Sequence, residues 1–185
     1  MSIKMLKKEE SVLVMIDVQE RLWPAMNEEE RDSLLERNEI LIKGCRCMDV
    51  PILVTQQYTK GLGGTVEPLC KALGEHSHIE KDTFSAMRDA NFVKELESLG
   101  RKTVILTGIE SHVCVMLTAL EMLQAGYDVF LPMDCVSSRK PMDKKFASKR
   151  MAGAGVQLTT SESVLFELCV GSTEPYFRDI SKLVK

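Results

Sequence analysis

The chain alternates between short apolar runs and longer segments in which apolar residues recur every three or four positions. Residues 11–16 (SVLVMI) form a nearly continuous apolar run, which is typical of a strand buried on both faces of a parallel sheet. In residues 30–48 the leucines and isoleucines repeat at helical spacing, which predicts a helix with one apolar face. By the same criteria we predict five more strands, at 51–55, 78–80, 102–106, 127–131 and 155–159, and further helices at 66–73, 113–125, 141–152, 161–170 and 174–184.

Turn and capping residues mark where these elements begin and end. Asp89 is predicted to cap a helix that stops at Gly100, and Thr159 has capping-box spacing to Glu162 before the helix at 161. Strands that alternate with helices predict a parallel sheet with right-handed crossovers and helices on both faces. Because 185 residues fit one domain, we expect residues 1–185 to form a single α/β domain.

Composition and charge narrow the function classes. The net charge of −3 leaves no basic footprint, so a nucleic-acid partner is not indicated. No apolar run approaches the roughly 18 residues of a membrane span, and residues 1–10 lack the apolar core of an export signal. We therefore expect a cytoplasmic protein without a membrane partner, whose six cysteines are reduced thiols. Because no C-x-x-C pair occurs, a zinc ribbon or disulfide scaffold is not favoured.

Three chemically active residues follow three of the predicted strands. Asp17 comes after the first strand, Lys81 after the third, and Cys114 at the start of the helix that follows the fourth. The carboxyl ends of parallel strands meet at one edge, where open α/β sheets hold their ligands. A helix N-terminus and a nearby ammonium lower a thiol pKa, so we expect thiolate character at Cys114. The carboxylate is then the base for the thiol, and backbone N–H groups at the helix start are candidates to bind an oxyanion.

Three stretches give the sequence a resemblance to a known family. Residues 16–19 (IDVQ), 81–85 (KDTFS) and 108–115 (GIESHVCV) resemble the signatures of the isochorismatase-like cysteine hydrolases, in the same order and over nearly the whole chain. The resemblance implies a catalytic triad of Asp17, Lys81 and Cys114. It also implies a cis peptide between Ile109 and Glu110, and an oxyanion hole made by the backbone N–H groups of Glu110 and Cys114. Residues 55–63, 136–139 and 158–162 further resemble the isochorismatase-domain-containing and YcaC-like branch, which has no well-settled substrate.

Departures from the family pattern refine this expectation. Isochorismatases proper lack the cysteine, so Cys114 argues against isochorismate as the substrate. Nicotinamidases carry an Asp-x-His metal motif where this chain has Gln56, Gln57 and Tyr58, so we expect neither a metal nor another cofactor. Position 110 is commonly small in the wider family. The Glu110 side chain here is either directed away from the pocket or reads a polar substrate, and both readings stay open.

The resemblance favours a doubly wound, three-layer α/β/α fold, with a six-stranded parallel sheet in the order 3-2-1-4-5-6. The predicted function is hydrolysis of a small amide-like C–N bond through a thioester at Cys114, in a homo-oligomer that binds a small-molecule substrate. Two alternatives stay open. One is a catalytically silent interaction protein, and the other is a thiol-redox sensor in which Cys135 approaches Cys114. His112 is expected either to orient Glu110 or to face solvent. Candidates for the pocket walls are Gln19, Trp23, Tyr58, Phe84 and Ile109.

Overall fold

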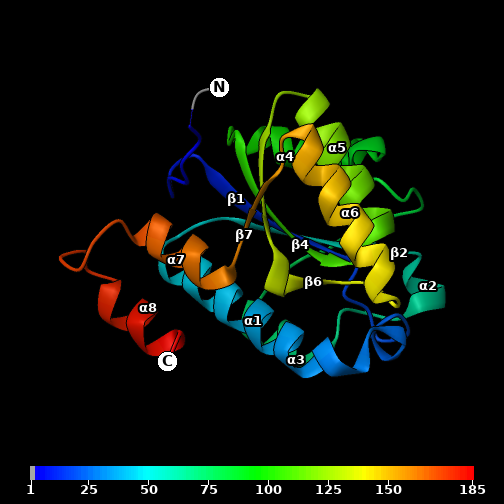
Figure 1. Cartoon of the computed structure of the whole chain (residues 1–185), viewed down its shortest axis with the longest axis horizontal. Coiled ribbons are helices and arrows are strands. Elements are labelled where there is room, and N and C mark those ends of the chain that lie inside the picture. The colour runs from blue at the N-terminus through cyan, green and yellow to red at the C-terminus, as the bar shows by residue number, and fades with distance from the viewer. Residues whose placement is uncertain (1–2) are drawn as a thin grey trace.

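In the computed structural model, which describes residues 3–185, a parallel sheet runs through the centre of the chain (Figure 1). Six strands follow the order β3-β2-β1-β4-β5-β7, and the short strand β6 pairs with the end of β4. All of these pairings are parallel. The strands are β1 (Ser11–Ile16), β2 (Ile52–Gln57), β3 (Ile79–Lys81), β4 (Thr103–Ile109), β5 (Asp128–Pro132), β6 (Val136–Ser137) and β7 (Gln157–Thr159).

Helices cover both faces of the sheet. One layer holds α1, α3, α7 and α8, and the other holds α4, α5 and α6, as Figure 1 shows. No helix within residues 3–185 is long and apolar enough to cross a membrane. The helices are α1 (Glu28–Cys47), α2 (Thr59–Leu62), α3 (Glu67–Leu73), α4 (Ala90–Ser98), α5 (Met116–Gln124), α6 (Pro141–Ala154), α7 (Ser161–Cys169) and α8 (Phe177–Leu183).

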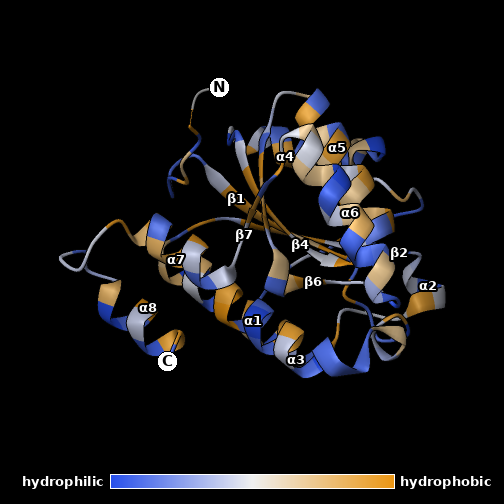
Figure 2. Ribbon diagram, in the orientation of Figure 1, coloured by the Kyte–Doolittle hydropathy of each residue, from blue (hydrophilic) through white to orange (hydrophobic). Residues whose placement is uncertain are grey.

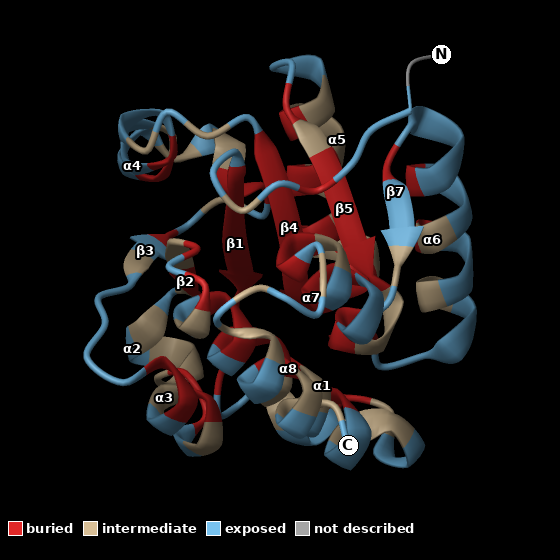
Figure 3. Ribbon diagram, turned by 90° about the vertical axis from the view of Figure 1, so that its left-hand side faces the viewer, coloured by how far each residue is buried: buried red, intermediate tan, exposed pale blue. Residues whose placement is uncertain are grey.

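The two central strands explain why the sheet is the core of the fold. Every residue of β1 and β4 is buried, and Figure 3 shows both strands red from end to end. Successive side chains of a strand point to opposite faces. Leu13 and Met15 therefore pack in the cluster beneath α1, α3, α7 and α8, whereas Val12, Val14 and Ile16 pack in the cluster beneath α4, α5 and α6. Figure 2 shows the resulting apolar centre between helices whose outer faces are hydrophilic.

The sheet order predicted from the sequence is confirmed, with β7 as the sixth strand of the path. The sequence reading missed β6, because a strand of two residues leaves no periodic pattern. It also placed one cap wrongly. The helix α7 is capped by Thr160, whose side chain accepts a hydrogen bond from the Ser163 N–H, and Thr159 is the last residue of β7 instead. The prediction that Asp89 caps α4 is confirmed by its bonds from the N–H groups of Asn91 and Phe92.

The strands β1 and β4 approach most tightly at their carboxyl ends, where Gly108 pairs with Ile16. Gly108 has φ of +117°, a conformation that side-chain-bearing residues rarely adopt. A Cβ atom at this position would lie 2.0 Å from the carbonyl oxygen of Ile16. Only glycine fits here, and it lets the two strands that carry Asp17 and Cys114 end side by side.

Candidate active site

Asp17 is the first residue after β1, and its backbone turns sharply there, with φ of +51°. The side chain is fully buried. Both carboxylate oxygens have partners, because Oδ1 accepts a hydrogen bond from the Thr55 hydroxyl at 2.7 Å and Oδ2 accepts one from Lys81 Nζ at 2.6 Å. A buried carboxylate is costly unless it is paired and hydrogen-bonded, and this one is both.

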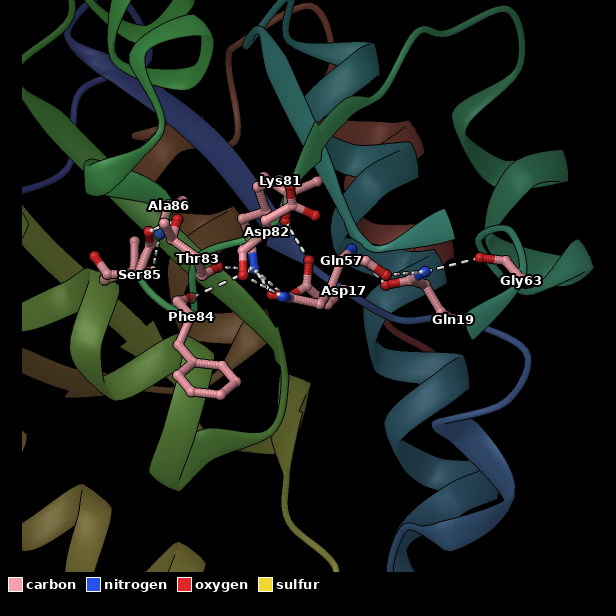
Figure 4. Close-up of polar contacts among 12 residues, drawn as sticks. Asp17, Gln19, Gln57, Gly63, Lys81, Asp82, Thr83, Phe84, Ser85 and Ala86 are labelled. Atoms are coloured by element: carbon pink, nitrogen blue, oxygen red, sulfur yellow. Dashed lines mark hydrogen bonds and ion pairs between the residues drawn. The ribbon is translucent and has the colours of Figure 1, made fainter. Parts of the chain in front are cut away.

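Lys81 ends β3, two strands away from β1 in the sheet, and its ammonium group reaches across to Asp17. Besides Asp17, Nζ donates to Gln57 Oε1 at 2.7 Å and to the carbonyl oxygens of Thr83 at 3.0 Å and Phe84 at 3.4 Å. Figure 4 shows these contacts converging on the ammonium, with the Phe84 ring directed away from them. The side chain is 0% exposed, so protein groups rather than solvent surround the ammonium.

Cys114 lies in a π-helical turn, Ser111–Val115, that joins β4 to α5. Its exposure is 7%, and burial raises the pKa of the thiol to about 12. The negative charge of Asp17 contributes to this raised pKa, and the Lys81 ammonium acts in the opposite direction. The expectation of a resting thiolate is therefore wrong, because burial outweighs the helix terminus and Lys81. The resting group is a neutral thiol.

The segment just before Cys114 contains the predicted cis peptide bond and the side chain of Glu110. The peptide bond between Ile109 and Glu110 is cis, which is the bond that the resemblance implies. The Glu110 side chain is 10% exposed, and its Oε2 accepts hydrogen bonds from the backbone N–H and the Nε of Arg139. His112 instead contacts Ser138, through its Nδ1 at 3.1 Å from the hydroxyl. Arg139 was not among the candidate residues, because nothing in the sequence links positions 110 and 139.

The predicted wall residues fall into two groups. Tyr58 is 54% exposed and Phe84 is 59% exposed, and Trp23 is partly buried against the cluster beneath α1. Ile109 and Gln19, in contrast, are fully buried. Gln19 holds the end of β2 in place, since its Nε2 donates to the Gln57 carbonyl and its Oε1 accepts from the Gln57 N–H. Both are therefore packed inside the protein rather than exposed as pocket walls.

Gln56 and Gln57 occupy the positions where the sequence reading excluded a metal motif. Gln57 binds Lys81 through Oε1 and donates from Nε2 to the Asp82 carbonyl, so both ends of its amide are engaged. Gln56 is buried and bonds the hydroxyls of Thr65 and Thr59. Within residues 3–185, no three His, Cys, Asp or Glu side chains gather as a metal site would require.

A hollow of about 870 Å³ opens at the other edge of the sheet, around the amino end of β2. Its lining includes Arg46, Pro51 and His76 but none of the three active residues. The chemistry and this volume therefore lie at opposite ends of the strands. Buried charges mark the site better than an open hollow does, because such charges are expensive to keep without a function.

A known protein family and several of its members are similar to this chain in sequence. A family model described as "Isochorismatase domain" matches residues 11–163. The chain is 36% identical over 180 residues to isochorismatase domain-containing protein 1 of Danio rerio, and the match covers 95% of this chain but only 61% of that protein.

Solved structures show the same fold over almost the whole chain. The MAR1 ribonuclease of Caenorhabditis elegans superposes with a TM-score of 0.91 at 36% identity, covering 98% of this chain and 92% of that one. YcaC of Pseudomonas aeruginosa, solved with hexane-2,5-diol and covalent acrylamide, gives 0.89 at 26% identity and covers 99% and 90%. YcaC of Escherichia coli, described as an octameric hydrolase of unknown specificity, gives 0.89 at 25% identity and covers 99% and 89%.

Proposed function

The chain belongs to the isochorismatase family, and from this premise we propose that it is a hydrolase that cleaves a small amide-like C–N bond through a thioester at Cys114. The observation that carries the proposal is that the buried Asp17 carboxylate is paired with the Lys81 ammonium and lies close enough to Cys114 for its charge to raise the pKa of that thiol. A thiol nucleophile beside a carboxylate base that is itself paired with a fixed ammonium meets the requirements of covalent catalysis.

The first half of the reaction forms the thioester. As the thiol sulfur attacks the carbonyl carbon of the substrate, the Asp17 carboxylate takes the thiol proton. The negative charge that develops on the carbonyl oxygen is stabilised by the backbone N–H groups of Glu110 and Cys114, which form the proposed oxyanion hole. Collapse of this intermediate breaks the C–N bond, and Asp17 returns its proton to the departing nitrogen, which leaves as ammonia or an amine.

The second half of the reaction releases the acid. Asp17, again a carboxylate, takes a proton from water as the water oxygen attacks the thioester carbon. The new intermediate collapses by breaking the S–C bond, and the sulfur regains a proton from Asp17, which restores the resting thiol. Lys81 takes no part in the proton transfers. Its positive charge stabilises the buried carboxylate of Asp17.

The surroundings of the site support a small-molecule substrate and a homo-oligomer. Trp23, Tyr58 and Phe84 are the proposed walls. Exposed apolar side chains that gather into a contiguous patch are typical of surfaces that meet a partner. Phe84 on the loop after β3, and Met142 and Phe146 on α6, are each about 60% exposed, so a second copy of this chain is the proposed cover. The E. coli relative is described as octameric.

Other functions fit less well. A disulfide between Cys114 and Cys135 is not favoured, because the two residues pack in the clusters on opposite faces of the sheet. All six cysteines are free, which fits a reducing, cytoplasm-like compartment. RNA cleavage, which the name of the C. elegans relative raises, finds no support in a net charge of −3 or in a buried thiol. A silent protein on this fold remains the main competitor.

Ammonia release from a panel of small amides, ureides and carbamoyl compounds tests the proposal. The expected result is turnover that falls at least about a thousandfold in Cys114→Ala, because the nucleophile is lost. Cys135→Ala is the matched control, since it removes another buried thiol outside the site and should keep the rate. Acid-quenched samples analysed by mass spectrometry should carry the acyl group on Cys114. Activity that survives Cys114→Ala would refute the mechanism, and no turnover with no adduct would favour the silent protein.

A further inference from the structure

Two of the four acceptors of the Lys81 ammonium are carbonyl groups of one loop, residues 82–86. Nζ donates to the carbonyl oxygens of Thr83 at 3.0 Å and Phe84 at 3.4 Å, as Figure 4 shows. Because N–H···O hydrogen bonds normally span about 2.7–3.2 Å, the second contact is already long and a small movement of the loop would break it. The position of this loop therefore decides how well a buried positive charge is compensated.

The loop is tied to the helix that follows the nucleophile. The backbone N–H of Ala86 donates to the Thr118 hydroxyl at 2.9 Å, and the Ser85 hydroxyl donates to Glu121 Oε2 at 2.6 Å. Thr118 and Glu121 are three positions apart on α5, so they lie on the same face of that helix. Helix α5 begins directly after the π-helical turn that holds the nucleophile. One continuous segment thus carries the nucleophile and both groups that hold the loop.

These contacts are made in the interior of the protein. Thr118, Ser85 and Ala86 are buried, so water competes little with the bonds between them. A buried N–H needs an acceptor, and Thr118 supplies it where the loop enters a short 3-10 helix, Ala86–Arg88. The Thr83 hydroxyl donates to the Ser85 carbonyl at 2.8 Å. That bond joins the anchored end of the loop to the part that contacts the ammonium.

Glu121 has partners that keep it ionised. Arg88 donates through Nε to Oε1 at 2.7 Å, while Oε2 accepts from Ser85. The bonds from Arg88 and from Ser85 lower the pKa of the Glu121 carboxyl. Hydrogen bonds to an ionised group are about twice as strong as neutral ones. The loop is therefore fixed to α5 by one neutral bond and one charge-assisted bond.

We propose that Thr118 and Glu121 are positioning residues that act through the 82–86 loop and Lys81 on the reactivity of Cys114. The inference rests on the proposed function, in that Cys114 is taken as the nucleophile. The positive charge of Lys81 acts against the raised pKa of that thiol. When the loop shifts, the ammonium loses two of its four acceptors and is held less firmly in the site. The thiolate then becomes harder to form, and the nucleophile reacts more slowly.

Alkylation of Cys114 by iodoacetamide tests this without knowledge of the substrate. Thr118→Val keeps the size of the side chain but removes the acceptor for the Ala86 N–H. The second-order rate at about pH 8, measured by peptide mapping, should fall about fivefold, which is the factor that one hydrogen bond is worth. Thr118→Ser keeps the hydroxyl and should stay within about twofold of the wild type. Thr103→Val is the matched control, because it changes a buried threonine at the amino end of β4 and should leave the rate unchanged.

A Lys81→Met background shows whether the effect passes through the ammonium. Adding Thr118→Val to Lys81→Met should change the Cys114 rate less than about twofold, because the charge that the loop positions is already gone. If Lys81→Met alone does not fold, Lys81→Met with Asp17→Asn serves as the background. Glu121→Gln keeps the size of that side chain and removes its charge. It should slow Cys114 about threefold, again only while Lys81 is present.

The outcomes separate this inference from the proposed function. An equal fall in both backgrounds would mean that the valine disturbs the site without acting through Lys81. That result would overturn the inference alone, as would a rate that does not fall in Thr118→Val and Glu121→Gln, or a loss that is as large in Thr118→Ser as in Thr118→Val. Failure of Cys114 to react in the wild-type protein would overturn the proposed nucleophile as well.

Discussion

Replacing Gly108 with alanine should damage the fold at the point where the active residues meet. The change adds one methyl group, and nothing else about the chain is altered. That methyl group would lie 2.0 Å from the Ile16 carbonyl oxygen, where ordinary contact begins at 3.4 Å, so the neighbouring backbone must move by more than 1 Å. The obstacle is main chain rather than a flexible side chain, and it cannot turn aside.

The size of the effect follows from two contributions. Alanine at φ of +117° costs about 1–3 kcal/mol, because side-chain-bearing residues avoid this region. Opening the β1–β4 pair at its last register position, Ile16 with Gly108, loses one or two backbone hydrogen bonds at about 1 kcal/mol each. We therefore expect Gly108→Ala to lower the free energy of unfolding by about 2–5 kcal/mol, which is a large part of the total stability of a typical domain.

Urea unfolding followed by circular dichroism and by the fluorescence of Trp23 measures this loss. Gly153→Ala is the matched control, because Gly153 lies in α6 and a Cβ there meets nothing within 4 Å. The same chemical change at that position should leave stability unchanged or raise it by up to about 1 kcal/mol, since alanine favours a helix over glycine. A Gly108→Ala protein within 1 kcal/mol of the wild type would refute the reasoning, because the strands would then have accommodated the methyl group freely.

Three other predictions concern Lys81, Cys114 and Gln57. Lys81→Met should lower the free energy of unfolding by about 3–5 kcal/mol at pH 7, because it leaves the Asp17 carboxylate buried without its cation. The Cys114 thiol, with its pKa raised to about 12, should make stability fall as pH rises through roughly 9 to 12, because the folded state keeps a proton that the unfolded state loses. The urea midpoint should therefore fall less between about pH 8 and 10.5 in Cys114→Ala. Dialysis against a metal chelator should leave the hydrolysis rate unchanged. Gln57 stands where nicotinamidases carry a metal motif, and both ends of its amide are already hydrogen-bonded to protein groups.

Each of these has a control and an outcome that contradicts it. Adding Asp17→Asn to Lys81→Met should recover part of the loss, and a double variant as unstable as the sum of the two would mean that the pair is not coupled. Equal slopes with pH in the wild type and in Cys114→Ala would show that burial does not hold the thiol proton. A rate that collapses after dialysis and returns with zinc would contradict the metal-free expectation.

Much of the fold was predictable because its central strands carry a strong signal. The runs at 11–16 and 102–106 are apolar on both faces, and only a strand deep in a parallel sheet needs that pattern. The π-helical turn Ser111–Val115 carries no such signal, because its five residues belong to a longer apolar stretch that reads as ordinary helix. The same limit hid β6, whose pairing with β4 depends on register in space rather than on local sequence.

The site was predictable in its residues but not in its energetics. Sequence placed Asp17, Lys81 and Cys114 after strands that meet at one edge, and the structure brings the three together there. The sequence does not show how far burial outweighs the effect of the helix terminus, so the predicted lowering of the Cys114 pKa was wrong. It also left Glu110 undecided, because the answer depends on Arg139, which is 29 positions away in the chain.

The four contacts of the Lys81 ammonium have a consequence for how this protein can change over evolution. Two of them go to the Asp17 base and to Gln57, and two go to the carbonyl groups of the loop that presents Phe84. The proposed catalytic base and the proposed wall residue Phe84 are therefore held by the same ammonium group, and we expect an insertion in the loop to disturb both. The segment from β6 to α6 contacts neither Asp17 nor Lys81 through any of these bonds. New substrate preferences should therefore accumulate on that side, where sequence can diverge while the reaction is preserved.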